Sequence, residues 1–102
     1  MKILILGSGA VGSVIAKCLD KDKKVSEIVC GCRDEKRAKK FIGKLEKVRL
    51  EKIDASNTNS IVKKAKDYDV IVNSSLPRFN LKIMEASLRA GCNYLDLASD
   101  LA

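Results

Sequence analysis

The chain has 102 residues with 46% hydrophobic and 32% charged side chains, a composition that is ordinary for one globular domain. No apolar run approaches the roughly 18 residues of a membrane span, and the chain opens on a strand-like segment rather than a signal peptide, so we expect a soluble cytoplasmic protein without a membrane partner. The net charge of +7 comes from lysines spread over the outer faces of several predicted helices, which argues against specific nucleic-acid binding.

The first predicted strand and helix flank a glycine motif. An unbroken apolar run predicts a buried strand at Lys2–Leu6, and apolar residues at helical spacing predict a helix at about Ala10–Asp20. The sequence that joins them reads Gly-Ser-Gly-Ala-Val-Gly over residues 7–12. A G-x-G-x-x-G pattern in this position is typical of a dinucleotide-binding βαβ unit, whereas the pattern alone would also fit a plain glycine-rich turn.

Each glycine of the motif has a distinct expected role. Gly7 permits the tight turn out of the strand, Gly9 lets the backbone approach a pyrophosphate, and Gly12 lets the helix pack closely on the strand. The helix N-terminus then presents free N–H groups and the positive end of its dipole to the phosphates. The motif therefore predicts a diphosphate-binding site at the end of the first strand.

The rest of the chain alternates between strands and helices. The further strands are expected at Glu27–Cys32, Val48–Ile53, Val70–Asn73 and Asn93–Leu97. The third strand alternates polar and apolar residues, which suits a sheet edge, whereas the first and fourth are solidly apolar and should be central. Right-handed crossovers then predict an α/β fold, a Rossmann-like doubly wound parallel sheet of five strands in the order 3-2-1-4-5.

Three further helices are expected between these strands. Asp34 is expected to cap the second helix, and the third spans about Thr58–Lys66. The fourth helix is expected to begin with Asn80 as its cap and to end at Gly91. The inner face of the second helix is expected to comprise Ala38, Phe41, Ile42 and Leu45.

The loop after the second strand bears on the choice of cofactor. NAD-binding domains place an acidic residue about 20 positions beyond the glycine motif to bind the ribose 2′-OH, but Cys32 stands 20 positions after Gly12 and Arg33 follows it. A cationic site favours NADP over NAD, because arginine can bind a phosphate through two hydrogen bonds. In the alternative, Arg33 stacks on the adenine and Asp34 binds the ribose of NAD.

Other loops at the carboxyl ends of the strands are candidates for the same ligand. Asp54 ends the third strand and is followed by small residues, so the backbone there can approach an adenine; a turn or a helix cap is the alternative. Ser74 and Ser75 could bind ribose or substrate, or belong to an ordinary loop. On the last strand, at best one of Tyr94 and Asp96 faces the site, and no residue stands out as a catalytic acid or base.

The chain has four cysteines and no histidine. Cys30 and Cys32 lie two apart on a predicted strand and so face the same side, and no C-x-x-C pattern is present. We therefore expect no metal site and no disulfide framework, and we interpret all four cysteines as buried thiols that act as small hydrophobic residues.

Three later segments, taken together with the glycine motif, resemble the N-terminal cofactor domain of the saccharopine dehydrogenase-like family, which includes saccharopine reductases and lysine 6-dehydrogenase-like enzymes. The segments are Lys52–Ser56, Val72–Asn80 and Ala90–Leu97. The resemblance implies hydride transfer at a carbon–nitrogen bond of an amino acid with NADP, or else NAD, as cofactor. It places around the cofactor Ser8, Gly9, Ala10 and Val11 at the pyrophosphate, Cys32 and Arg33 at the adenosine ribose or its phosphate, Asp54 and Ala55 at the adenine, and Leu76 and Pro77 at the nicotinamide ribose.

Enzymes of this family carry a second domain that holds most of the substrate contacts and the dimer interface, and nothing in residues 1–102 corresponds to it. We therefore expect one NAD(P)-binding Rossmann domain that forms the N-terminal part of a longer, homodimeric enzyme. Alone it should bind the dinucleotide but not turn over the amino-acid substrate. The alternative is a stand-alone Rossmann domain that senses a nucleotide and regulates a partner.

Overall fold

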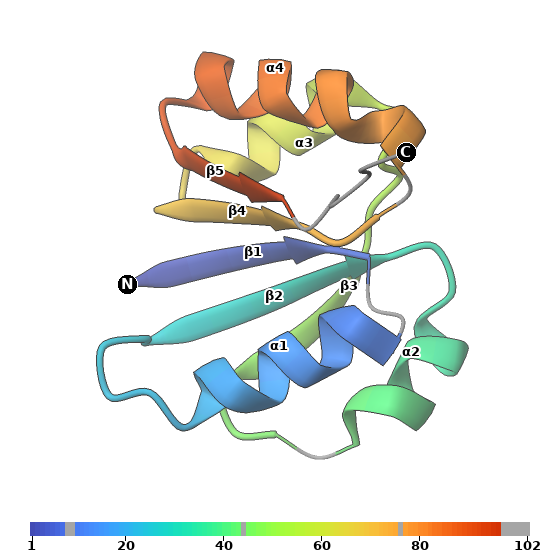
Figure 1. The fold of residues 1–102 in the computed structure, drawn as a ribbon, viewed down its shortest axis with the longest axis vertical. Helices are drawn as coiled ribbons and strands as arrows, with labels where there is room; N and C mark the ends of the chain where they lie inside the picture. Colours follow the sequence, from blue (N-terminus) through green and yellow to red (C-terminus); the bar gives the residue numbers. More distant parts are fainter. Residues whose placement is uncertain (8–9, 44, 76, 97–102) are drawn as a thin grey trace.

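The computed structural model describes residues 1–7, 10–43, 45–75 and 77–96, which form a five-stranded sheet between two layers of helices (Figure 1). The sheet order is β3-β2-β1-β4-β5 and every neighbouring pair is parallel, so the predicted Rossmann-like topology is confirmed. The strands are β1 (Lys2–Leu6), β2 (Glu27–Cys32), β3 (Val48–Lys52), β4 (Val70–Asn73) and β5 (Asn93–Asp96). The third strand thus ends one residue before the predicted Ile53, and Leu97 lies outside the described residues.

Four α-helices and one short 3₁₀ helix join the strands. They are α1 (Ala10–Asp20), α2 (Glu35–Ile42), α3 (Thr58–Ala65), η1 (Pro77–Phe79) and α4 (Asn80–Ala90). In the part of the chain that the structure describes, no helix is both long enough and apolar enough to cross a bilayer.

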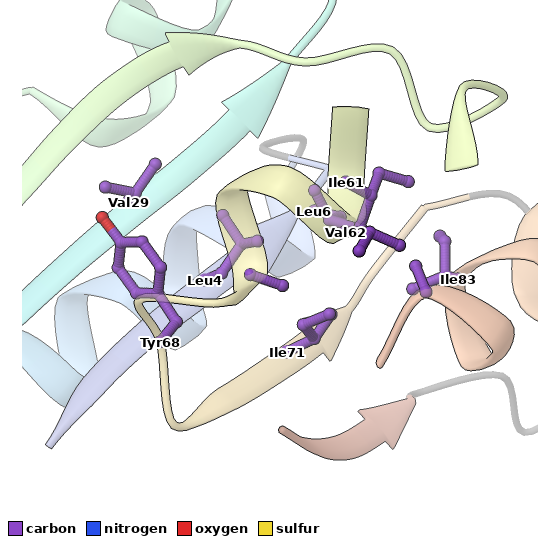
Figure 2. Close-up of a cluster of buried hydrophobic side chains, with 10 residues drawn as sticks. Leu4, Leu6, Val29, Ile61, Val62, Tyr68, Ile71 and Ile83 are labelled. Atoms are coloured by element: carbon purple, nitrogen blue, oxygen red, sulfur yellow. The ribbon is translucent and has the colours of Figure 1, made fainter. Parts of the chain in front are cut away.

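The helices cover both faces of the sheet, with α1 and α2 on one side and α3 and α4 on the other (Figure 1). Side chains of β1 alternate between the two layers: Leu4 and Leu6 belong to the cluster under α3 and α4, and Ile3 and Ile5 to the cluster under α1. Figure 2 shows the first cluster, in which Ile83 of α4 lies close to side chains of α3 and β4. Burial on both faces explains why β1 is a continuous apolar run.

Helix α2 ends earlier than its predicted inner face requires. Helix α2 ends at Ile42 with Gly43 as its C-cap at φ +66°, so Leu45 lies beyond the helix, although it still packs against the core. Asp34 caps α2 as predicted, through its side chain and the N–H of Arg37. Ala38 is buried as expected. The structure does not describe the side chains of Phe41 and Ile42, which were predicted on the same face.

Helix α3 ends at Ala65, one residue before the predicted Lys66, which is its C-cap. Asn57 caps α3 by accepting the N–H of Ser60, a cap that we did not predict. The predicted cap of α4 is wrong: Asn80 is the first helical residue, and its side-chain oxygen accepts a hydrogen bond from the amide of Asn73 instead. Gly91 ends α4 in the left-handed region at φ +75°, as expected.

The cysteines divide by burial. Cys30 and Cys32 are buried and Cys92 is half-buried, whereas Cys18 is exposed, so the expectation of a buried thiol was wrong at Cys18. Burial, with a smaller contribution from nearby Cys32, raises the pKa of the Cys30 thiol from 9.0 to about 12.

The raised pKa of Cys30 predicts a loss of stability in alkali. The folded state keeps the thiol protonated between pH 9 and about 12 while the unfolded chain loses the proton, so the free energy of unfolding falls by up to about 1.4 kcal/mol per pH unit in this window. Urea titrations at several pH values measure the slope. The Cys30→Val variant, which has no thiol there, should show a shallower slope; identical slopes would contradict the assignment.

Candidate functional site

A cavity of about 260 Å³ opens where the carboxyl ends of β1, β2 and β4 meet. The register places Leu6 of β1 level with Gly31 of β2 and with Asn73 of β4, and the arrowheads of these strands point to this edge of the sheet (Figure 1). The chain reverses its strand order between β1 and β4, which is where open α/β sheets bind ligands. The lining residues are Leu6, Gly7, Gly31, Cys32, Arg33, Ile53, Ala55, Ser74, Ser75 and Phe79.

Gly7 forms the turn at the floor of this cavity. Its φ is +89°, a conformation that favours glycine. A Cβ atom at this position would lie 2.9 Å from backbone atoms of Ser74 and Ser75, so the space is already filled by the chain that leaves β4. The bare backbone of Gly7 therefore lets the ends of β1 and β4 come together.

Gly12 brings the first turn of α1 against the end of β1. A Cβ atom on Gly12 would lie 2.0 Å from the carbonyl oxygen of Gly7, far closer than any real contact. The helix N-terminus, with its free N–H groups, is thereby held next to the cavity. The backbone of Ala10 and Val11 lies in this first turn, while Ser8 and Gly9 lie outside the described residues.

The hydroxyl of Ser74 serves the scaffold. Its Oγ lies 2.9 Å from the carbonyl oxygen of Leu6 and 2.5 Å from that of Gly7, and its N–H also donates to Leu6. The side chain thus ties the loop after β4 to the end of β1. These hydrogen bonds give the Ser74 hydroxyl a structural role within the loop, which is what the ordinary-loop alternative expects.

Asn73 organises a polar network beneath the same loop. Its side chain is 2% exposed. Its amide nitrogen donates to Oδ1 of Asn80 at 2.7 Å and to the hydroxyl of Tyr94 at 3.0 Å, and its oxygen accepts the N–H and the hydroxyl of Ser75. Tyr94 donates in turn to Asp96 at 3.0 Å. The network joins β4, β5 and α4 and fixes Ser75 at the wall of the cavity.

The loop after β2 supplies the cation of the site. Cys32 is buried, with its Sγ 3.6 Å from the carbonyl oxygen of Glu51, whereas Arg33 is exposed and lines the cavity. Asp34 accepts the N–H of Arg37 at 3.2 Å as the cap of α2. In the alternative with NAD this carboxylate would bind the ribose; in the structure its Oδ1 caps α2.

Asp54 stands beside the cavity in a tight turn. Its carboxylate accepts the N–H of Ser56 at 2.9 Å and the hydroxyl of Ser56 at 2.6 Å, and its carbonyl accepts the N–H of Asn57. These hydrogen bonds, with smaller contributions from Arg33 and Lys82, lower the pKa of Asp54, so it is ionised at neutral pH. The side chain of Asp54 therefore closes a turn, and the approach of its backbone to an adenine stays a prediction.

The structure thus brings several predicted residues together and places others at the margin. Gly7, Cys32, Arg33 and Ala55 line one cavity, and Gly12 abuts it. Pro77 begins η1, while Leu76 lies outside the described residues. Our sequence interpretation missed three lining residues that have no polar chemistry to mark them: Leu6, Gly31 and Ile53.

Comparison with known proteins decides the family. Residues 3–101 match the family described as "Saccharopine dehydrogenase NADP binding domain". The chain belongs to this family. It is 31% identical over 102 residues to carboxyaminopropylagmatine dehydrogenase of Synechocystis, covering 96% of this chain, and 28% identical over 109 residues to carboxynorspermidine synthase of Vibrio cholerae, covering 94%. The chain spans 26% of the length of each of these relatives.

A solved structure agrees with the fold. Apo saccharopine dehydrogenase (L-Glu forming) of Saccharomyces cerevisiae superposes with a TM-score of 0.76 at 19% identity, over 93% of this chain and 21% of that one. Family membership and the Rossmann-like sheet together support a dinucleotide cofactor. The glycine-built floor at Gly7 and Gly12, the adjacent helix N-terminus and the cation at Arg33 fit such a ligand.

Proposed function

We propose that this chain is the NADP(H)-binding domain of an oxidoreductase that acts at a carbon–nitrogen bond of an amino-acid substrate. The observation that carries the proposal is the cavity at the switch point, which has a bare backbone floor on one side and Arg33 on the other. The capping role of Asp34 supports NADP over NAD, because its Oδ1 already accepts the N–H of Arg37.

Each part of the cavity has a role in this proposal. The main chain at Gly7 and the first turn of α1 would receive the pyrophosphate, and Arg33 would bind the phosphate on the adenosine ribose. Ala55 and Ile53 offer apolar surface to the adenine. Phe79 and Ser75 lie on the β4 side, where the nicotinamide half would rest. A bound nicotinamide dinucleotide supplies the hydride exchange.

The substrate class comes from the relatives. The matched proteins are named as a dehydrogenase and a synthase of nitrogen-containing compounds, carboxyaminopropylagmatine and carboxynorspermidine. Because this chain spans 26% of their length, we propose that the amino-acid substrate is held by a second domain of a longer, homodimeric and cytoplasmic protein in which residues 1–102 come first.

The proposal predicts preferential binding of NADPH. We expect calorimetric titration of the 102-residue chain to give an affinity for NADPH at least about tenfold higher than for NADH, because the extra phosphate gains a charge-assisted hydrogen bond from Arg33. The Ala55→Leu variant, which places a larger side chain at the cavity wall, should weaken both dinucleotides with little change in melting temperature.

Absence of binding by either dinucleotide would overturn the proposed function, and tighter binding of NADH would overturn the choice of NADP. The catalytic part of the proposal is tested on the longer protein. Its oxidation of NADPH should depend on an amine together with an aldehyde or 2-oxo acid, and failure with every such pair would count against action at a carbon–nitrogen bond.

A further inference from the structure

A second cavity adjoins the first at the end of β3. It measures about 320 Å³ and is lined by Arg33, Lys52, Ile53 and Asp54. Arg33 and Ile53 also line the first cavity, so the two cavities meet along these side chains. The second cavity therefore extends the candidate dinucleotide site toward the edge of the sheet that β3 forms.

Lys52 is placed in this cavity by the register of the sheet. It is the last residue of β3 and pairs with Cys32, the residue directly before Arg33. Its neighbour Glu51 is bound to Lys64, with 2.7 Å between Nζ and Oε1. Among the residues that the structure describes, the exposed ammonium of Lys52 has no hydrogen bond or ion pair. Lys52 therefore places a positive charge beside the candidate cofactor site, and no contact among the described residues explains that charge.

The two aspartates near this cavity each accept local hydrogen bonds through Oδ1. Asp54 is the acidic residue of its lining, and its carboxylate accepts two hydrogen bonds from Ser56. Asp34 caps α2. Two cations, Arg33 and Lys52, therefore face one carboxylate that is held in a turn, and the balance of charge in the cavity is positive.

We propose that Arg33 and Lys52 together bind a phosphate monoester in this second cavity, the 2′-phosphate of NADP(H). This inference rests on the proposed function, since it concerns the same cofactor. A phosphate monoester carries a charge of about −1.5 to −2 at neutral pH and offers several strong acceptor oxygens. A guanidinium can grip two of these oxygens, and an ammonium adds a point charge beside them.

Lys52 distinguishes this site from the alternative role of Arg33. An arginine at the end of β2 can stack on the adenine of either dinucleotide, so loss of Arg33 weakens NADH and NADPH alike if stacking dominates. A lysine ammonium lacks a planar face for stacking. Lys52 should therefore increase the affinity for NADPH, which carries the 2′-phosphate, and leave the affinity for NADH unchanged.

The test compares Lys52→Gln with Lys66→Gln by calorimetry of the 102-residue chain with NADPH and NADH. Lys66 is also exposed and follows the last turn of α3, away from the cavities, so its variant loses the same charge elsewhere. We expect Lys52→Gln to weaken NADPH about 5- to 20-fold, the range of an exposed charge-assisted hydrogen bond, and NADH less than twofold. Lys66→Gln should change both less than twofold, and Lys52→Arg should retain the preference.

The outcomes separate the two proposals. If the unmodified chain binds neither dinucleotide, the proposed function fails. If it binds NADPH but Lys52→Gln binds NADPH equally well, or loses both dinucleotides to the same extent, the phosphate site fails and the proposed function stands. Titration with adenosine 2′,5′-bisphosphate against adenosine 5′-monophosphate repeats the comparison on the adenosine half alone, and only the bisphosphate should respond to Lys52→Gln.

Discussion

Replacing Gly12 with alanine is expected to lower the free energy of unfolding by about 2–4 kcal/mol, a large part of the total stability of a small domain. The added Cβ would lie 2.0 Å from the carbonyl oxygen of Gly7. That oxygen belongs to the backbone at the end of β1 and cannot rotate away as a side chain would, so the start of α1 must move off the sheet. Urea unfolding followed by far-UV circular dichroism measures the loss.

Helix propensity makes the opposite prediction for the same change. Alanine is favoured over glycine inside a helix by about 1 kcal/mol, and Gly12 lies in the first turn of α1. If the close approach to Gly7 did not exist, Gly12→Ala would stabilise the protein. The sign of the measured change therefore decides between the two effects, and a stability equal to or above that of the parent chain would contradict the packing in the structure.

Gly43→Ala is the matched control for this experiment. Gly43, unlike Gly12, has a positive φ of +66°, a conformation that favours glycine, and a Cβ there would meet nothing within 4 Å. Its replacement should cost about 1–2 kcal/mol, the strain of a positive φ alone. A larger loss at Gly12 than at Gly43 isolates the steric overlap between α1 and β1.

The sheet could be predicted because its pattern depends on burial, which the sequence records residue by residue. β1 is apolar at every inner position since helices cover both of its faces, and the half-exposed alternation of β3 marks the edge that it occupies. The order of the strands then follows from crossover handedness. A local rule failed where a residue of another element intervened: the sequence predicts Asn80 as a helix cap, but its side chain accepts a hydrogen bond from the amide of buried Asn73 in β4.

The candidate site was predictable in outline for a topological reason. Loops at the carboxyl ends of neighbouring parallel strands must converge, so Cys32, Arg33 and Ala55 could be placed together without coordinates. The inner wall of the cavity could not be predicted in this way. Leu6 and Gly31 belong to strands rather than to loops, and the hydrogen bond from Ser74 to the end of β1 joins residues 68 positions apart, with no local pattern that predicts it.

Replacing Asn73 with alanine is expected to cost about 2–4 kcal/mol of unfolding free energy, because the change leaves several buried polar groups without partners. The side chain is 2% exposed and takes part in hydrogen bonds with Asn80, Tyr94 and Ser75. Urea titration measures the loss. Asn59→Ala is the control, since its oxygen accepts one exposed hydrogen bond from Arg89 at 3.3 Å, and it should change stability by less than about 0.5 kcal/mol.

Tyr94→Phe shows whether Asn73 acts through a network or through separate contacts. The phenylalanine variant removes the hydroxyl that joins Asn73 to Asp96 and keeps the ring. Its cost should be about 0.5–1.5 kcal/mol, that of a typical hydrogen bond. The stability loss of the double variant should be smaller than the sum of the two single losses by more than about 0.5 kcal/mol, because both changes remove the hydrogen bond between Asn73 and Tyr94. Strict additivity would mean that Asn73 stabilises the fold chiefly through Asn80 and Ser75.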